Sequence, residues 1–153
     1  MSLNQVFTTS CAEETEQIGA SLASEFCKDT TLPPFGALYG DLGVGKTAFV
    51  RGFASVITPS IPVRSPTFAI VNEYRASGRN LFHFDMYRID SEDDLLSIGF
   101  YDYWDRDGIC LVEWSEKIPY ALPETYLRVE IQKSDPLCPD QRSITVSLVK
   151  EDI

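Results

Sequence analysis

The hydrophobic positions along this chain switch between strand-like and helix-like spacing. Ile18, Leu22 and Phe26 recur every four residues, and Phe49 and Phe53 repeat that spacing, which predicts two amphipathic helices. Apolar residues elsewhere alternate with polar ones or form short runs, which predicts strands at 6–8, 35–39, 68–74, 80–84, 108–112, 127–131 and 144–148. Strands interleaved with helices are typical of α/β proteins.

Polar residues at the ends of these stretches refine the element boundaries. Ser10 with Glu13 three residues later forms a capping-box pattern, which predicts a helix that opens at Ser10. Ser91 with Asp94 predicts a second helix start by the same pattern. The prolines within 59–66 predict a non-helical connection, because proline disfavours helix at itself and at the residue before it.

Two pairs of neighbouring strands predict hairpins, 68–74 with 80–84 and 127–131 with 144–148. The predicted fold is therefore a three-layer α/β domain with a mixed sheet, a parallel core near residues 35–39 and antiparallel hairpin additions. A chain of 153 residues suits a single domain, residues 1–153.

Residues 40–47, GDLGVGKT, fit the G-x-x-x-x-G-K-[ST] pattern of a phosphate-binding loop. Its glycines allow positive φ angles and a close approach of backbone N–H groups to phosphate oxygens. Lys46 would contact the β- and γ-phosphates, and the Thr47 hydroxyl would ligate Mg²⁺. A strand-like stretch precedes the loop and a helix-like stretch follows it, as this motif requires. The sequence predicts a P-loop protein that binds a nucleoside triphosphate.

Two acids directly follow apolar stretches, where α/β sheets present their ligands. Asp85 resembles the Walker B carboxylate, which holds Mg²⁺ or its water shell, with an exposed turn aspartate as the alternative. Glu113 follows the most hydrophobic stretch, and a carboxylate there requires a cation or hydrogen bonds. We expect Glu113 to ligate Mg²⁺ or to orient the attacking water. Thr67 matches the switch threonine that senses Mg²⁺ and the γ-phosphate, with an ordinary strand residue as the alternative.

Four further residues are assigned by weaker arguments. Arg88 and Arg142 are candidates for neutralising γ-phosphate charge, although most arginines are solvated surface groups. His83, the only histidine, is interpreted as a packed and hydrogen-bonded strand residue off the Asp85 side of the strand, without a catalytic role. Trp114 fits the core as well as it fits stacking on a base or a partner.

The composition limits the partners. A formal net charge of −10 argues against direct binding of nucleic acid, which needs many Lys or Arg side chains at phosphates. The cysteines lack CxxC spacing, which favours free thiols over zinc or redox chemistry. A membrane-spanning helix needs about 20 consecutive apolar residues, and no apolar run in this sequence approaches that length. The N-terminus has no signal-peptide pattern. We expect a cytoplasmic protein without membrane contact.

Several short motifs occur in a fixed order along the chain. They are GDLGVGKT at 40–47, SPTF at 65–68, HFDMYR at 83–88, DLLSIGFYDYW at 94–104 and LVEW at 111–114. Together they resemble the TsaE family (formerly YjeE), the bacterial ATPases of tRNA threonylcarbamoyladenosine biosynthesis. The resemblance runs from about Ser10 to Pro123, and the C-terminal hairpin matches only in kind. Val44 departs from the small residue usual at its position, where the backbone makes the contact.

The resemblance implies a cytoplasmic Mg²⁺-dependent ATPase, slow without partners, that works with the TsaB and TsaD proteins and contacts tRNA only indirectly. Those partners install threonylcarbamoyl on the adenosine next to the anticodon. It implies that the metal ligands are Thr47 and Glu113. The predicted catalytic residues are Lys46, Asp85, Glu113 and Thr67. The predicted nucleotide-binding residues are Ser10, Ala12, Gly40, Asp41, Leu42, Gly43, Val44, Gly45, Lys46, Thr47, Asp85 and Arg142.

Three other functions remain open. A small-metabolite kinase also uses this loop, but such kinases close an arginine-rich lid, and residues 89–110 are acidic with Arg106 as the single arginine. A GTP-driven switch would show an N/T-K-x-D guanine motif, which this sequence lacks, so adenine is favoured. A nucleotide-dependent interaction module with little turnover is the third.

Overall fold

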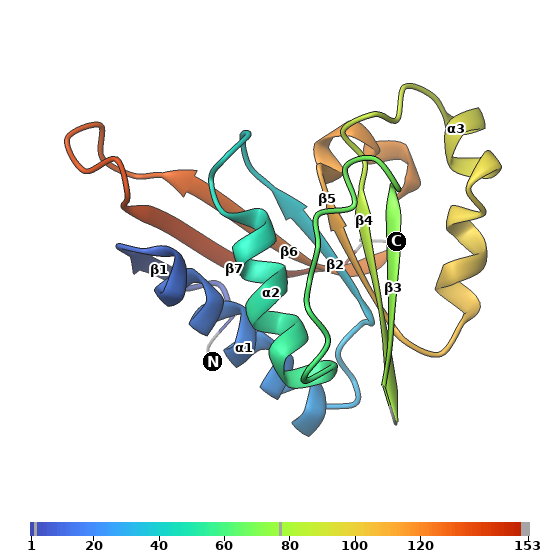
Figure 1. Ribbon diagram of the computed structural model, residues 1–153, viewed down its shortest axis with the longest axis horizontal. Coiled ribbons are helices and arrows are strands. Elements are labelled where there is room, and N and C mark those ends of the chain that lie inside the picture. The colour runs from blue at the N-terminus through green and yellow to red at the C-terminus, as the bar shows by residue number, and fades with distance from the viewer. Residues whose placement is uncertain (2, 77, 151–153) are drawn as a thin grey trace.

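The computed structural model describes residues 1, 3–76 and 78–150, which form one sheet covered by helices on both faces (Figure 1). The sheet has seven strands in the order β1-β7-β6-β2-β5-β4-β3. The strands are β1 (Val6–Thr9), β2 (Phe35–Tyr39), β3 (Val71–Ala76), β4 (Arg79–Asp85), β5 (Ile109–Glu113), β6 (Thr125–Lys133) and β7 (Arg142–Lys150).

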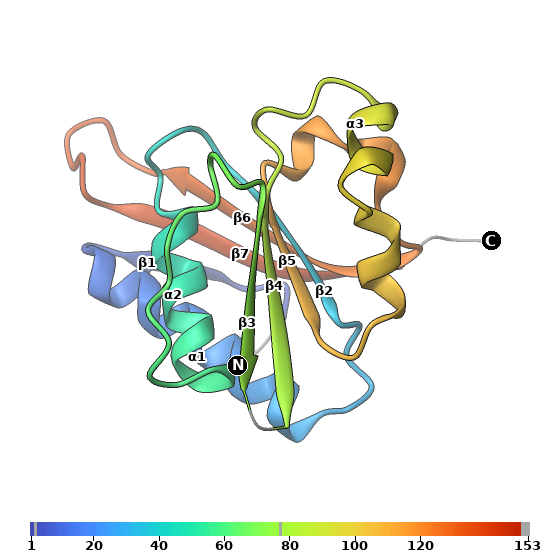
Figure 2. The ribbon, with the colours of Figure 1, turned by 45° about the vertical axis from the view of Figure 1, so that its right-hand side comes forward.

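The helices form two separate layers, as Figure 2 shows. One layer contains the α-helices α1 (Ala12–Lys28) and α2 (Lys46–Ile57). The other contains α3 (Glu92–Ser97) and the 3₁₀ helix η1 (Phe100–Asp105). The short 3₁₀ turns η2 (Ser115–Lys117) and η3 (Pro119–Ala121) follow β5. The three-layer arrangement predicted from the sequence is confirmed.

Strand directions match the predicted mixed sheet. β2 pairs in parallel with both β5 and β6, and β4 pairs in parallel with β5. The antiparallel additions are β3 on β4, β7 on β6 and β1 on β7. The predicted C-terminal hairpin is confirmed, and its first strand, β6, also belongs to the parallel core.

Each face of the sheet has its own core. Phe49, Phe53 and Leu22 from the helices pack with Leu38 and other strand residues on the α1–α2 face. The two helices touch closely there, because a Cβ on Gly52 would lie 1.8 Å from the Glu16 carbonyl oxygen. The opposite face is dominated by aromatic rings in edge-to-face contact, from Phe35, Phe82, Phe84, Phe100, Tyr103 and Trp104.

Three predicted boundaries change. The capping box is wrong: α1 begins at Ala12, Cys11 is its N-cap residue, and the Ser10 N–H donates to Glu14 rather than Glu13, over 3.3 Å. The first hairpin arm begins at Val71, since the three residues before it form a turn in which the Ile70 N–H donates to the Pro66 carbonyl at 2.7 Å.

The third change shortens a turn. Pairing of β3 and β4 continues to Ala76 and Arg79, so part of the predicted 75–79 turn is strand, and Ser77 lies outside the described residues. The Ser91 N-cap is confirmed by its side chain, which accepts from the Asp94 N–H. In the described part of the chain, no helix combines the length and the hydropathy needed to cross a membrane.

Candidate nucleotide-binding site

The phosphate loop connects β2 to the N-terminus of α2, with the lysine of the motif as the first helical residue. Gly45, the N-cap residue of α2, has a φ of 114°, in the region that favours glycine. Gly40 has a φ of 148°, and a Cβ there would lie 2.5 Å from the Ile131 carbonyl oxygen of β6. The glycines thus let the loop curl tightly over the end of β6 and direct helix N–H groups toward an anion.

Lys46 is 5% exposed and lies inside this loop. Its ammonium donates to the Gly40 carbonyl and, over 3.2 Å, to the Asp41 carbonyl. The ammonium also lies 3.7 Å from the centroid of the Trp114 ring, a cation–π contact. Burial lowers the pKa of Lys46, while the nearby carboxylates, Glu116 first, oppose that shift. A nucleotide polyanion would relieve this desolvation of the charged lysine.

Thr47, in the first turn of α2, meets Glu113, the last residue of β5. The Thr47 hydroxyl donates to the Glu113 carboxylate, with its oxygen 3.2 Å from Oε1 and 3.3 Å from Oε2. Glu113 is only 3% exposed, as expected for a carboxylate that ends an apolar strand and requires polar partners.

His83 is packed and hydrogen-bonded in a strand, as interpreted, but its predicted placement off the Asp85 side of that strand is wrong. Residues 83 and 85 lie on the same face of β4, because side chains in a strand alternate with a period of two. His83 therefore faces the site, and its Nε2 lies 2.5 Å from Glu113 Oε2. Its side chain is fully buried.

Asp85 and Thr67 form the other polar pair. The Thr67 hydroxyl donates to Asp85 Oδ2 over 3.3 Å and lies 2.7 Å from the Ser65 hydroxyl. The Tyr87 N–H donates to Asp85 Oδ1 at 2.9 Å. Asp85 is 6% exposed, which rules out the exposed-turn alternative. Burial raises the pKa of Asp85, with the Tyr87 hydrogen bond opposing the shift and Glu113 adding to it.

These residues line one pocket of about 260 Å³, here named the acidic pocket. All four predicted catalytic residues belong to it. Its lining residues are Leu42, Gly43, Gly45, Lys46, Thr47, Ala48, Ser65, Thr67, Asp85, Glu113 and Trp114.

A second pocket of about 350 Å³, here named the arginine pocket, shares Gly43, Gly45 and Ala48 with the acidic pocket. Arg142 donates through Nε to the Val44 carbonyl at 2.8 Å and thereby ties β7 to the phosphate loop. Its lining residues are Ser10, Cys11, Ala12, Thr15, Gly43, Val44, Gly45, Ala48, Asp140 and Arg142. The structure thus brings the Ser10–Ala12 segment and Arg142 to the same side of the loop.

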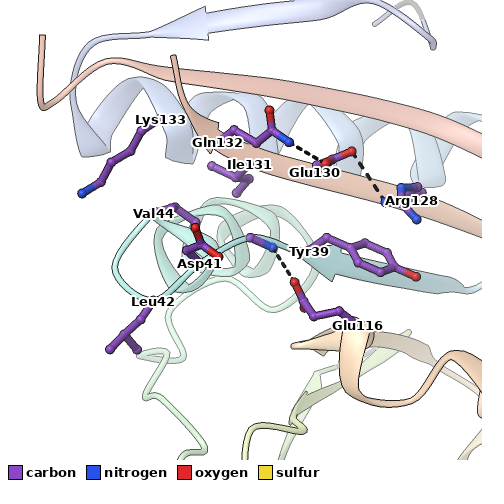
Figure 3. Close-up of a pocket in the computed structure, with 11 residues that line it drawn as sticks. Tyr39, Asp41, Leu42, Val44, Glu116, Arg128, Glu130, Ile131, Gln132 and Lys133 are labelled. Atoms are coloured by element: carbon purple, nitrogen blue, oxygen red, sulfur yellow. Dashed lines mark hydrogen bonds and ion pairs between the residues drawn. The ribbon is translucent and has the colours of Figure 1, made fainter. Parts of the chain in front are cut away.

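A third pocket, of about 540 Å³, lies on the β6 side of the loop and is drawn in Figure 3. It is lined by Gly40 and Asp41, which are absent from the linings of the other two pockets. Glu116 accepts from the Gly40 N–H at 3.1 Å and so links η2 to the start of the loop. Arg128 and Glu130 form an ion pair of 3.6 Å along β6.

The oxygens of Thr47 and Glu113 fit a hard cation such as Mg²⁺, because that ion prefers oxygen ligands. Among the described residues, no group of three or more His, Cys, Asp or Glu side chains is arranged to hold a metal. In nucleotide sites Mg²⁺ is usually held by one or two side chains together with phosphates and water.

Sequence reasoning missed or undervalued several residues at the site. Trp114, left between core and site, has a φ of 59° that turns its ring toward Lys46. Ser65 was visible only as part of the SPTF motif. Glu116 has no local sequence signal. Arg88 is not brought to the site: its guanidinium stacks 4.6 Å from the centroid of the exposed Phe68 ring, and it lines neither loop pocket next to α2.

The comparison with protein families decides the wider relationship. A family model described as "Threonylcarbamoyl adenosine biosynthesis protein TsaE" matches residues 9–144. The chain belongs to the TsaE family. The match covers the phosphate loop, both strand-end acids and Arg142, so the resemblance seen in the short motifs is confirmed. With its phosphate loop, this TsaE-family chain has a P-loop fold.

Individual TsaE relatives support this membership. A Haemophilus influenzae protein named tRNA threonylcarbamoyladenosine biosynthesis protein TsaE is 44% identical over 98 residues, which are 64% of this chain and 62% of that protein. A Bacillus subtilis protein of the same name is 38% identical over 137 residues, 90% of this chain and 81% of that protein. The crystal structure of Bacillus subtilis YdiB matches with a TM-score of 0.74 and 31% identity, over 95% of this chain and 84% of that one.

The coverage of the relatives is unequal. The matched segment spans only about three fifths of the Haemophilus influenzae protein, 62%. The match to YdiB, by contrast, covers 84% of that chain.

Proposed function

We propose that this chain binds and hydrolyses ATP as a component of the machinery that makes threonylcarbamoyladenosine in tRNA. The observation that carries the proposal is the acidic pocket, where Lys46, Thr47, Asp85 and Glu113 from three parts of the chain meet beside the phosphate loop. The names of the TsaE relatives supply the pathway. We treat residues 1–153 as one ATPase domain, which the continuous sheet supports.

In this proposal each side chain has a role at the triphosphate. Lys46 leaves the loop carbonyls and contacts the β- and γ-phosphates, while the N–H groups at the start of α2 bind phosphate oxygens. Thr47 and Glu113 would hold Mg²⁺, which when bound neutralises charge on the β- and γ-phosphates. Glu113 would also orient a water for attack, and Asp85 with Thr67 would act at the γ-phosphate.

The arginine pocket would hold the rest of the nucleotide. It shares Gly43, Gly45 and Ala48 with the acidic pocket, so a ligand whose phosphates follow the loop would reach both. Ser10, Ala12 and Arg142 would flank it there. In this division the acidic pocket carries the chemistry and the arginine pocket contributes affinity.

The kinase alternative is weakened by the region that would form its lid. Leu95 of α3 and Phe100 of η1 are fully buried against the aromatic face of the sheet. This segment is part of the core, and a lid must move away from its core to admit substrate. A GTP preference has no supporting motif.

The proposed partners are the TsaB and TsaD proteins, in the cytoplasm, with tRNA contacted only indirectly. The net charge of −10 supports this, since the chain repels a polyanion. A gel shift with tRNA at physiological salt should show no complex with this protein alone. A stable complex under those conditions would contradict the indirect role.

The decisive experiment measures phosphate release from ATP with and without TsaB, TsaD and tRNA, with Mg²⁺ present. We expect slow release alone and stimulated release with the partners, lost in Lys46→Ala and Glu113→Ala. Glu124→Ala, an exposed change before β6, is the matched control. Tight nucleotide binding with no release under any condition would favour the interaction module instead.

A further inference from the structure

His83 is a buried polar residue that the proposed reaction does not yet use. Its side chain is fully buried, and its Nε2 lies 2.5 Å from Oε2 of Glu113. The two residues come from neighbouring parallel strands, β4 and β5, in which Asp85 pairs with Glu113. His83 and Glu113 therefore sit at fixed positions on a rigid part of the sheet.

The hydrogen bonds of His83 place its ring proton on Nε2. A carboxylate oxygen only accepts, so Nε2 must donate for the 2.5 Å contact to form. Nδ1 is buried and has no hydrogen-bond partner among the described residues. A proton on Nδ1 would leave a buried donor unpaired, which is unfavourable.

The two carboxylate oxygens of Glu113 are thus used differently. Oε2 accepts from His83 and also lies 3.3 Å from the Thr47 hydroxyl oxygen, whereas Oε1, 3.2 Å from that oxygen, is left free of His83. A hydroxyl has one proton and two lone pairs, so Thr47 can donate to Glu113 and still offer a lone pair to a cation. The arrangement leaves Oε1 facing the position where the phosphate loop begins α2.

We propose that His83 is a positioning residue that fixes the rotamer of Glu113, so that Oε1 faces the Mg²⁺ of a bound nucleotide. This inference rests on the proposed function, because it assigns the metal role to Glu113. Outer partners that orient a metal ligand typically contribute about 10- to 100-fold to metal affinity or activity. His83 acts through Glu113 and touches neither nucleotide nor metal.

The first test uses the fact that the chain has a single histidine. Nitrogen-15 NMR of the imidazole in the nucleotide-free protein should show a slowly exchanging proton on Nε2 and none on Nδ1. Glu113→Gln should shift that Nε2 proton strongly. A proton on Nδ1, or an Nε2 proton signal that does not shift in Glu113→Gln, would overturn the proposal without any assay of activity.

The second test compares two changes at the same position. His83→Gln keeps an N–H donor near the place of Nε2, and His83→Leu removes it. Leu81→Val, at a buried site on the same face of β4, is the control for destabilisation alone. The measurement is the dissociation constant of fluorescent methylanthraniloyl-ATP in Mg²⁺ and in EDTA, whose ratio reports how much the metal tightens binding.

We expect His83→Leu to lower that ratio about 10-fold or more, with binding in EDTA unchanged, and His83→Gln to restore most of it. Leu81→Val should lower thermal stability and leave the ratio at the wild-type value. If wild type shows metal-dependent binding and His83→Leu matches it, the positioning role fails while the proposed function stands. If wild type shows no metal dependence, both fail.

Discussion

The acidic pocket and the arginine pocket share two glycines of the phosphate loop, yet they are built differently. The acidic pocket contains buried charged groups, Lys46, Asp85 and Glu113, at the ends of adjacent β-strands or the start of α2. The arginine pocket contains exposed residues at the start of α1, together with Arg142 at the start of β7.

This difference has a physical consequence. Buried charges are worth more in a low-dielectric site and need no reorganisation when the reaction begins, which suits the stabilisation of developing charge. Exposed groups are screened by water, so each contributes little beyond contact area. We therefore expect changes in the acidic pocket to affect turnover and changes in the arginine pocket to affect affinity.

The largest expected effect comes from Glu113→Gln, which keeps the shape of the side chain and removes its charge. Turnover of ATP should fall about 100- to 1000-fold, because the variant would lose the carboxylate that holds the charge-stabilising Mg²⁺. Binding of ATP without metal should stay close to wild type. Single-turnover phosphate release and equilibrium binding separate the two effects, with Glu124→Gln as the control. A loss confined to affinity would break the proposed division between the pockets.

Arg142→Lys should have the converse effect. Lysine keeps the charge but cannot reproduce the fork of contacts to the carbonyls of Val44, at 2.8 Å, and Gln141, at 3.0 Å. We expect about 10-fold weaker ATP binding, equal to about 1.4 kcal/mol, with turnover of the bound nucleotide unchanged. Calorimetric titration with ATP and turnover at saturation check this. A fall in turnover at saturation would place Arg142 with the catalytic groups.

Asp85→Asn should raise the stability of the nucleotide-free protein. Burial raises the pKa of Asp85, so between the unfolded and folded pKa the folded state binds more protons. The stability of wild type therefore falls as pH rises through that window. Asparagine avoids this cost. The gain in melting temperature, about 2–4 °C for about 1 kcal/mol, should therefore be present at pH 8 and vanish as pH falls from the folded pKa to the unfolded pKa.

Thermal unfolding of Asp85→Asn and wild type at about pH 3.5–8 tests the predicted direction of this pH dependence. The interval runs from about the ordinary pKa of aspartate to just above neutral pH. Turnover of ATP should fall in the same variant, because the charge serves the reaction. A variant that is less stable than wild type at pH 8 would mean that the charged Asp85 is compensated by its hydrogen bonds to Tyr87 and Thr67.

The smallest effect concerns Cys11, an exposed thiol in the arginine pocket. Bound ATP should slow its alkylation by iodoacetamide, since the ligand would cover it. Cys27 and Cys138 are also exposed but line neither pocket, so they serve as internal controls within the same sample. Peptide mass spectrometry measures all three rates. Equal alkylation rates at Cys11 with and without ATP would contradict the proposal that the nucleotide occupies the arginine pocket.

The fold was largely predictable because its signals are local. The period-two and period-four spacings identified every strand and both long helices, and the phosphate loop identified the junction of β2 with α2. The boundaries that failed, at Ser10 and at Phe68, depend on how neighbouring segments pack. In the second case the chain turns before β3, and the exposed Phe68 ring stacks with Arg88 instead of joining the sheet.

The sequence by itself determined the phosphate loop and the two strand-end acids, because each follows from residues a few positions apart. The tertiary structure decided which distant groups meet: Thr47 with Glu113, 66 residues apart, and Arg142 with Val44, 98 residues apart. It also joined His83 to Glu113 and set Trp114 against Lys46. These contacts depend on which strands become neighbours. Strand order comes from packing across the whole sheet, and local periodicity carries no information about it.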